Sequence, residues 1–299
     1  MIKAILVAAA FSLVVSCQSI RQPDAEVSQE LRSHMDRYVA LFNAADAETI
    51  GEEIYAVPTM FVDPATNSHT VLEATDEVQQ FWQDTFTAIK SKGWRKSVIH
   101  ELSFRMSGSD MAIASLVFSR LRANGDPIPP AKRRANYIFL KTSAGWRIIF
   151  VSGQPEHDRQ VSPDVTDQLR GLMGRYIGFL NGDTPAADVS EKIWMTPRIS
   201  RSFLGAREHS AMMQGPLAHQ KLDGYLTQLK AQGLHRFTID NVEVHMASKD
   251  LAFVDLFSER LREDGSAIPP GRTGFTYVWL RKSAGWRMVA TLAHGDQME

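Results

Sequence analysis

Cysteine is almost absent from this sequence, because only Cys17 among 299 residues is a cysteine. A disulfide within the chain is therefore excluded. The sequence also has no excess of positive or negative charge. It contains 33 lysines and arginines and 34 aspartates and glutamates, which gives a formal net charge of −1. This balance predicts no nucleic-acid partner, and the short basic run at 132–134 fits a solvated strand edge.

Motifs for metal, phosphate and nucleophile chemistry are missing as well. None of the nine histidines stands at metal-ligand spacing from a cysteine, another histidine or a carboxylate pair. Glycine-rich phosphate loops and the sequence contexts of activated serine or cysteine nucleophiles do not occur. We therefore expect no metal and no cofactor. The sequence favours a binding protein over an enzyme, and an enzyme remains the alternative.

Long apolar runs are limited to the beginning of the chain. Lys3 precedes apolar residues from Ala4 to Val15, a stretch too short to span a bilayer as a helix and typical of a secretory signal. An ordinary signal peptide with a cysteine in it is one interpretation. The other is a lipoprotein, because residues 14–17 resemble the lipobox of bacterial lipoproteins.

The lipobox resemblance has several implications. It divides the start into a signal peptide at 1–16 and a lipidated tether at 17–29. The acyl chains on Cys17 would anchor the protein to a membrane, because each buried methylene contributes about 0.8 kcal/mol. Gln18 follows the cysteine, which in such lipoproteins implies the outer membrane and an exported, periplasmic-side location.

The rest of the chain contains one domain twice. Residues 119–130 and 259–270 are closely similar, and a Ser-Ala-Gly-Trp-Arg segment follows each at Ser143 and Ser283, so that the offset is 140. A repeat of this length suits a whole domain. We assign domains to 30–155 and 167–295, with a linker at 156–166.

Each repeat changes its hydrophobic period part of the way along. Apolar residues recur at helical spacing over 27–47 and 74–92, while Pro58 is expected to end a short second helix and open an extended segment. Segments near 95–106, 110–122, 134–142 and 145–153 are rich in β-branched and aromatic residues and are separated by turn formers. The second repeat has the same order. The pattern predicts an α+β fold twice, with helices on a curved, mostly antiparallel sheet.

This order, with Arg-x-Arg-x-x-Gly from Arg120 and Ala-Gly-Trp-Arg in the last hairpin, resembles the SnoaL-like branch of the NTF2-like superfamily. The resemblance implies a cone with a pocket between helices and sheet, and an internal pseudo-dimer of the two repeats. It also implies a protein that binds a small, mostly apolar molecule or acts as a scaffold.

Residues 37–46 and 61–64 of the first repeat are similar to ketosteroid isomerases. That resemblance implies that Tyr38 donates a hydrogen bond to a substrate oxygen and that Asp63 shuttles a proton, which would make the protein an isomerase or a SnoaL-like cyclase. Two departures stand against it, because Tyr137 lies where a second acid is expected and Phe203 or Ser202 replaces Asp63 in the second repeat. A core tyrosine and an Asp-Pro turn are the alternative.

Other candidates for ligand contacts come from the comparison of the repeats. His69 and His209 are the only histidines that both repeats keep, and they suit either a pocket or a local hydrogen bond in a loop. Arg120 lies on an apolar strand face, where it could hold an anion, stack on Trp146 or pair between the repeats. The predicted ligand-binding residues are His69, Arg120, Tyr137, Tyr176, His209 and Tyr277.

Overall fold

The structure is a computed structural model that describes residues 22–63, 66, 68–155, 163–184, 189, 192–201, 209–212 and 215–294. The predicted signal peptide and Cys17 lie outside these residues, as does most of the predicted linker. No helix in the described ranges is long and apolar enough to cross a membrane.

The first domain begins with helices whose apolar faces are buried against a sheet. They are α1 (Ala25–Ala44), α2 (Ala47–Thr49), the π-helical turn η1 (Ile50–Ile54) and, further along, α3 (Thr75–Lys90). The Asp24 side chain accepts a hydrogen bond from the Val27 backbone N–H at 2.9 Å and so begins α1. In its last turn, Asn43 exchanges hydrogen bonds of 3.1 and 2.7 Å with the backbone of Ser97. These contacts fix α1 against the strand that it covers.

Six strands form the sheet of this domain. They are β1 (Tyr55–Asp63), β2 (Ser68–Leu72), β3 (Lys96–Met106), β4 (Met111–Leu121), β5 (Arg133–Thr142) and β6 (Gly145–Pro155). Their order is β2-β1-β6-β5-β4-β3. All neighbours are antiparallel except β1 and β6, which are parallel.

The second domain repeats this plan. Its elements are α4 (Pro163–Leu180), β7 (Trp194–Arg201), β8 (His209–Met212), α6 (Gly215–Ala231), β9 (Arg236–Ser248), β10 (Leu251–Leu261), β11 (Ala267–Lys282) and β12 (Gly285–Ala293). The sheet order β8-β7-β12-β11-β10-β9 matches that of the first domain strand for strand. Asn181 repeats the bonds of Asn43, here to the backbone of Phe237 at 3.1 and 2.7 Å. The predicted α+β class of both repeats is confirmed.

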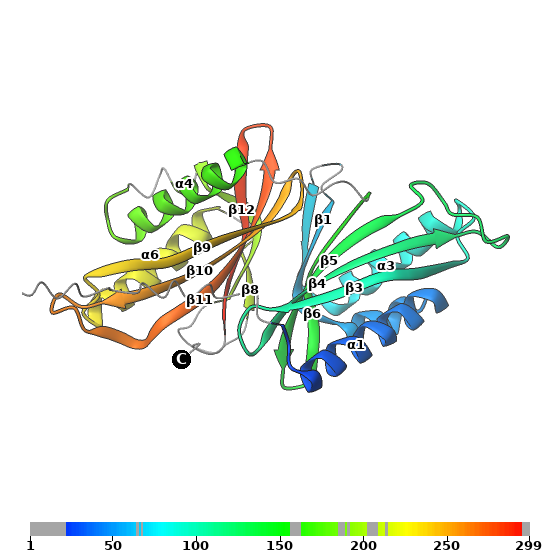
Figure 1. Ribbon diagram of the computed structural model, residues 1–299, viewed down its shortest axis with the longest axis horizontal. Coiled ribbons are helices and arrows are strands. Elements are labelled where there is room, and N and C mark those ends of the chain that lie inside the picture. Colours follow the sequence, from blue (N-terminus) through cyan, green and yellow to red (C-terminus); the bar gives the residue numbers. More distant parts are fainter. Residues whose placement is uncertain are drawn as a thin grey trace, which may run out of the picture.

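The two sheets pack against each other through the faces that the helices leave free. Figure 1 shows the domains side by side, with the sheets meeting at the centre near β1 and β12. One apolar cluster contains buried residues of both sheets, among them Met60, Ile138 and Phe150 from the first and Phe253 and Val278 from the second. Each sheet is therefore buried on both faces, which explains the long apolar runs of its central strands.

Two sequence expectations need correction. Pro58 does not end a helix but lies inside β1, which begins three residues earlier at Tyr55. The pairing of β1 with β6 is irregular between Tyr55 and Met60, so the missing N–H of the proline leaves no gap in a regular ladder. The segment around His69, expected as a loop, is the edge strand β2.

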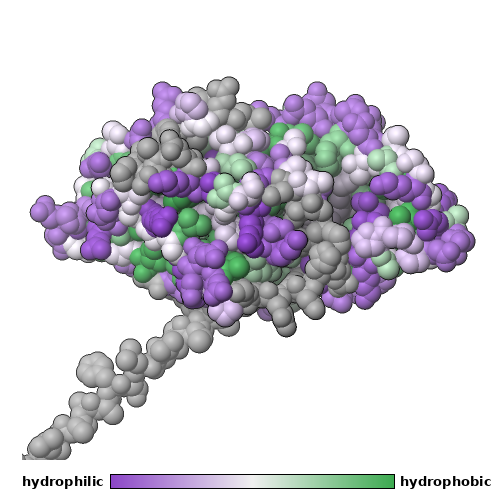
Figure 2. Space-filling model, turned by 90° about the horizontal axis from the view of Figure 1, so that it is seen from above, coloured by the Kyte–Doolittle hydropathy of each residue, from purple (hydrophilic) through white to green (hydrophobic). Residues whose placement is uncertain are grey.

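The outer surface is mainly polar where it can be seen. Figure 2 shows hydrophilic residues over much of one face, with smaller hydrophobic areas between them. This distribution suits a protein whose apolar strand faces are used inside each domain and between the two.

Candidate functional site

The first domain contains a cavity of about 270 Å³ between α1, α3 and the inner face of its sheet. This volume is close to the lower end of small-molecule pockets, which span about 300 to 1,000 Å³. The walls are mostly apolar and aromatic, with a few polar groups. The lining residues are Tyr38, Val39, Phe42, Phe61, Val62, Asp63, Ser68, His69, Thr70, Phe81, Trp82, Thr85, Ser97, Ile99, Leu116, Phe118, Arg120, Ala135, Tyr137, Val151 and Gly153.

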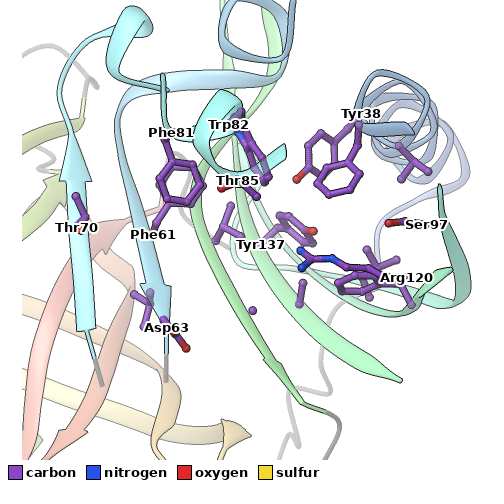
Figure 3. Close-up of a pocket in the computed structure, with 18 of the residues that line it drawn as sticks. Tyr38, Phe61, Asp63, Thr70, Phe81, Trp82, Thr85, Ser97, Arg120 and Tyr137 are labelled. Atoms are coloured by element: carbon purple, nitrogen blue, oxygen red, sulfur yellow. The ribbon is translucent and has the colours of Figure 1, made fainter. Parts of the chain in front are cut away.

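Two tyrosines bring their hydroxyl groups to the inner part of this pocket (Figure 3). Tyr38 comes from α1 and Tyr137 from β5, and their ring centroids are 5.9 Å apart at 74°. Burial raises the pKa of both hydroxyls well above the usual value, although the charge of Arg120 acts in the opposite direction. Both tyrosines therefore remain neutral at neutral pH, and their hydroxyls hydrogen-bond to each other.

Arg120 places a cation beside these hydroxyls. Its guanidinium lies about 6 Å from the ring centroids of Phe42 and Phe118, at 6.0 and 5.9 Å, and its buried Nε makes no hydrogen bond. Burial, together with Arg133, lowers its pKa, while the two tyrosines act to raise it. No ion pair joins Arg120 to a carboxylate in the described part of the chain. Arg120 does not make the expected stack on Trp146, because the cation over that ring is Lys141, at 5.6 Å from the centroid.

Asp63 lines the same pocket from the end of β1. Figure 3 shows it away from Tyr38, Tyr137 and Arg120, which lie together on the other side. Its carboxylate accepts a hydrogen bond of 2.8 Å from the Thr66 hydroxyl, and the side chain is half-buried. The structure thus brings Tyr38 and Asp63 to one cavity, with the carboxylate in a polar, partly solvated setting.

The two histidines that the repeats share connect the domains to each other. His69 Nε2 donates to the carbonyl oxygen of Pro197 at 2.9 Å, and His209 Nε2 donates to that of Pro58 at 2.6 Å. His69 also lines the pocket, and burial lowers its pKa. The expected local hydrogen bond within a loop is therefore incorrect, because each histidine contacts the opposite repeat.

The second domain has a different interior. Tyr176 and Tyr277 are buried with ring centroids 5.7 Å apart, and the guanidinium of Arg198 is 4.5 Å from the ring centroid of Trp194. Arg198 is 2% exposed and donates to Thr291, while its Nε and Nη1 make no hydrogen bond. The strand pairing shows that Arg198 occupies the place of Thr59 in the first domain. The interior of the second domain therefore contains a cation that the first domain lacks at this place.

Polar contacts also lie between the two sheets. Arg105 forms an ion pair with the buried Asp255, and Arg201 binds Asp110 through two nitrogens, at 3.2 and 2.5 Å. A second cavity, of about 240 Å³, lies next to Arg105 and His245. In the described ranges, no cluster of three or more histidine, cysteine, aspartate or glutamate side chains suits a metal ion.

Sequence reasoning missed several residues of the pocket and interface. Phe61, Thr85 and Ser97 line the pocket, and their strand or helix periodicity alone does not tell a pocket wall from a filled core. Arg198 and Arg201 carried a usable signal, because they lie in one strand with Trp194 and Ile199, and charged residues that are buried require partners or a ligand.

The fold and the pocket define a tandem of cone-shaped α+β domains with an NTF2-like architecture. The chain belongs to the family described as NTF2-like protein (DUF6841), which matches residues 28–156 and 164–296. The resemblance to the NTF2-like superfamily inferred from the sequence is thereby confirmed. A comparison with curated proteins found no match.

The solved structures to which the chain is similar each match about half of it. An NTF2-like superfamily protein from Salmonella enterica serovar Typhimurium has 21% identity and a TM-score of 0.36, and the match covers 47% of this chain and 99% of that one. An NTF2-like protein from Novosphingobium aromaticivorans has 18% identity and a TM-score of 0.36, with coverage of 43% and 80%. Aln2 from a Streptomyces species has 12% identity and a TM-score of 0.37, with coverage of 50% and 100%.

Proposed function

We propose that the first domain binds a small, mostly apolar molecule in the cavity beneath α1 and α3. The observation that supports this most directly is an aromatic-lined cavity of about 270 Å³ that also contains a few convergent polar groups. A structural core would instead be closely packed, with few voids larger than a water molecule.

The test is native mass spectrometry of the chain purified from its own host, combined with a variant that fills the pocket. Gly153 lines the cavity on the same strand face as Val151, and a Cβ at Gly153 would meet no atom within 4 Å. Gly153→Leu therefore adds a side chain without a backbone clash. A bound molecule should be present in the natural protein and lost from this variant.

The matched control is Gly171→Leu, because Gly171 lies on α4 and its Cβ would also meet nothing within 4 Å. This variant should keep the bound molecule. An empty natural protein, or a Gly153→Leu protein that retains the ligand, would contradict the proposal. Either result would favour a scaffolding role instead.

A proton-transfer isomerase or cyclase is the second candidate, supported by the presence of Tyr38 and Asp63 in one cavity. The α-protons of an enolisable ketone such as 2-acetylnaphthalene would then exchange in D₂O faster with the natural protein than with Asp63→Asn. Proton NMR measures this exchange. Equal rates for the two proteins would remove Asp63 as a base and leave the binding role.

We further propose that the protein is exported and anchored to the outer membrane through an acylated Cys17, with residues 17–29 as a tether. The lipobox-like sequence supports this. Since α1 begins at Ala25, residues 25–29 of the proposed tether belong to that helix. Mass analysis of the mature N-terminal peptide tests it, since a diacylglyceryl cysteine should be present and Cys17→Ser should release the protein from membranes.

A further inference from the structure

The inner end of the first-domain pocket combines one positive charge with two phenol hydroxyls that hydrogen-bond to each other. The groups there are the guanidinium of Arg120 and the hydroxyls of Tyr38 and Tyr137, which Figure 3 shows gathered in one place. A guanidinium cannot accept a hydrogen bond, and a phenol donates readily to an anion. This end of the pocket therefore suits an acceptor that carries negative charge.

Arg120 is a cation in an apolar setting without a carboxylate partner among the described residues. Aromatic rings of Phe42 and Phe118 flank it, its Nε is buried without an acceptor, and the neighbouring charge of Arg133 repels it. Burying a charge without a partner is costly, so buried charges in proteins are normally paired or bind an ion. A ligand anion would supply the missing partner.

The other end of the pocket has the opposite charge. Asp63 lines the cavity on the far side from Arg120, as Figure 3 shows. One arginine balances a single negative charge. The pocket thus favours a monoanion that enters with its charged group towards Arg120.

We infer that the ligand of this pocket is a small aromatic or alicyclic monocarboxylic acid. This inference rests on the proposed binding function and specifies the chemical class of the ligand. Arg120 binds the carboxylate, and the Tyr137 hydroxyl exchanges its hydrogen bond to Tyr38 for one to this anion. The apolar body lies against Phe61, Phe81 and Trp82, whose rings form the opposite wall.

Two matched pairs of probes separate the charge from the apolar body. Benzoate and 2-naphthoate carry the carboxylate, whereas acetophenone and 2-acetylnaphthalene replace one of its oxygens with a methyl group. Isothermal titration of the full chain measures the four dissociation constants. We expect at least one carboxylate to bind about tenfold or more tightly than its ketone, as for a charge-assisted hydrogen bond in a dry site.

Arg120→Gln should weaken carboxylate binding by about tenfold or more and change ketone binding less than about twofold. Arg120→Lys should retain part of the preference, because it keeps the charge but loses the planar fork. Arg95→Gln is the control, since Arg95 is exposed and its replacement removes the same unit of charge. Thermal unfolding by circular dichroism verifies that each variant is folded.

Equal affinity of both carboxylates and their ketones would overturn the inference, and so would a loss in Arg120→Gln that is the same for both classes. Binding of the ketones in that case would leave the proposed function intact. Failure of all four probes to bind would also overturn the inference, while the native mass spectrum decides the proposed function separately.

Discussion

His69 Nε2 lies 2.9 Å from the carbonyl oxygen of Pro197, so the edge strand of the first sheet holds the first strand of the second. His209 makes the reciprocal contact with Pro58 at 2.6 Å. The two repeats therefore share these histidines because each repeat uses one to bind the other. The histidines predicted to contact a ligand therefore also connect the domains, and His69 lines the pocket as well.

His69→Ala should lower the free energy of unfolding by about 1 to 2 kcal/mol, because the carbonyl of Pro197 loses a donor in a half-buried place. Urea denaturation measures the change. The exposed His235 supplies the control, and His235→Ala should stay within about 0.5 kcal/mol of the natural protein. Equal effects of the two substitutions would contradict the assigned role of His69.

The ion pair of Arg105 with Asp255 should be strongly coupled. Asp255→Asn leaves Arg105 without its charge partner in the interface and should cost about 3 to 5 kcal/mol. The double variant with Arg105→Gln should cost less than the sum of the single changes. Urea unfolding of all four proteins tests this, and additive effects would show that the two side chains act independently.

Stability should fall as the pH is lowered from 7 to 4, in part because of His294. Burial lowers its pKa from 6.5 to about 4, with Asp255 acting in the opposite direction. Between these two values the unfolded chain binds the proton and the folded chain does not, so acid favours unfolding. One such histidine contributes a slope of up to about 1.4 kcal/mol per pH unit.

Urea unfolding at several pH values measures this slope. His294→Gln removes the titrating group while keeping a side chain that can donate to Thr276, which His294 Nε2 contacts at 3.0 Å. The slope between pH 4 and 6.5 should become flatter in this variant. An unchanged slope would mean that other groups account for the acid sensitivity, such as His34, whose pKa burial also lowers to about 4.

Gly274→Ala should be destabilising because the chain passes close to His294 there. A Cβ at Gly274 would lie 2.3 Å from His294 Nδ1 and 3.0 Å from a Phe257 ring carbon, so the imidazole would have to move. We expect a loss of about 1 to 3 kcal/mol from overpacking. Gly224→Ala, in the open on α6, is the control and should be neutral or stabilising, and a similar loss in both would refute the steric argument.

Local chemistry explains which parts of the fold could be predicted. The hairpins of the sheet follow from turn residues such as Gly125 and Gly265, whose positive φ of 87° and 80° suits glycine. The parallel pairing of β1 with β6 joins segments about 90 residues apart, and no local signal specifies it. The sequence could assign Tyr38 and Arg120 to a helix face and a strand face. It could not predict that they line a cavity, because a cavity depends on how completely the surrounding side chains fill the space.

The two domains adhere through a common apolar core and not only through the chain that joins them. The protein is thus equivalent to a dimer of unlike subunits that are always made in equal numbers. A symmetric dimer must change both of its interiors at once, whereas here Arg198 lies in one interior while the other has Thr59 at the matching place. Covalent fusion allows one half to specialise while the other preserves the assembly.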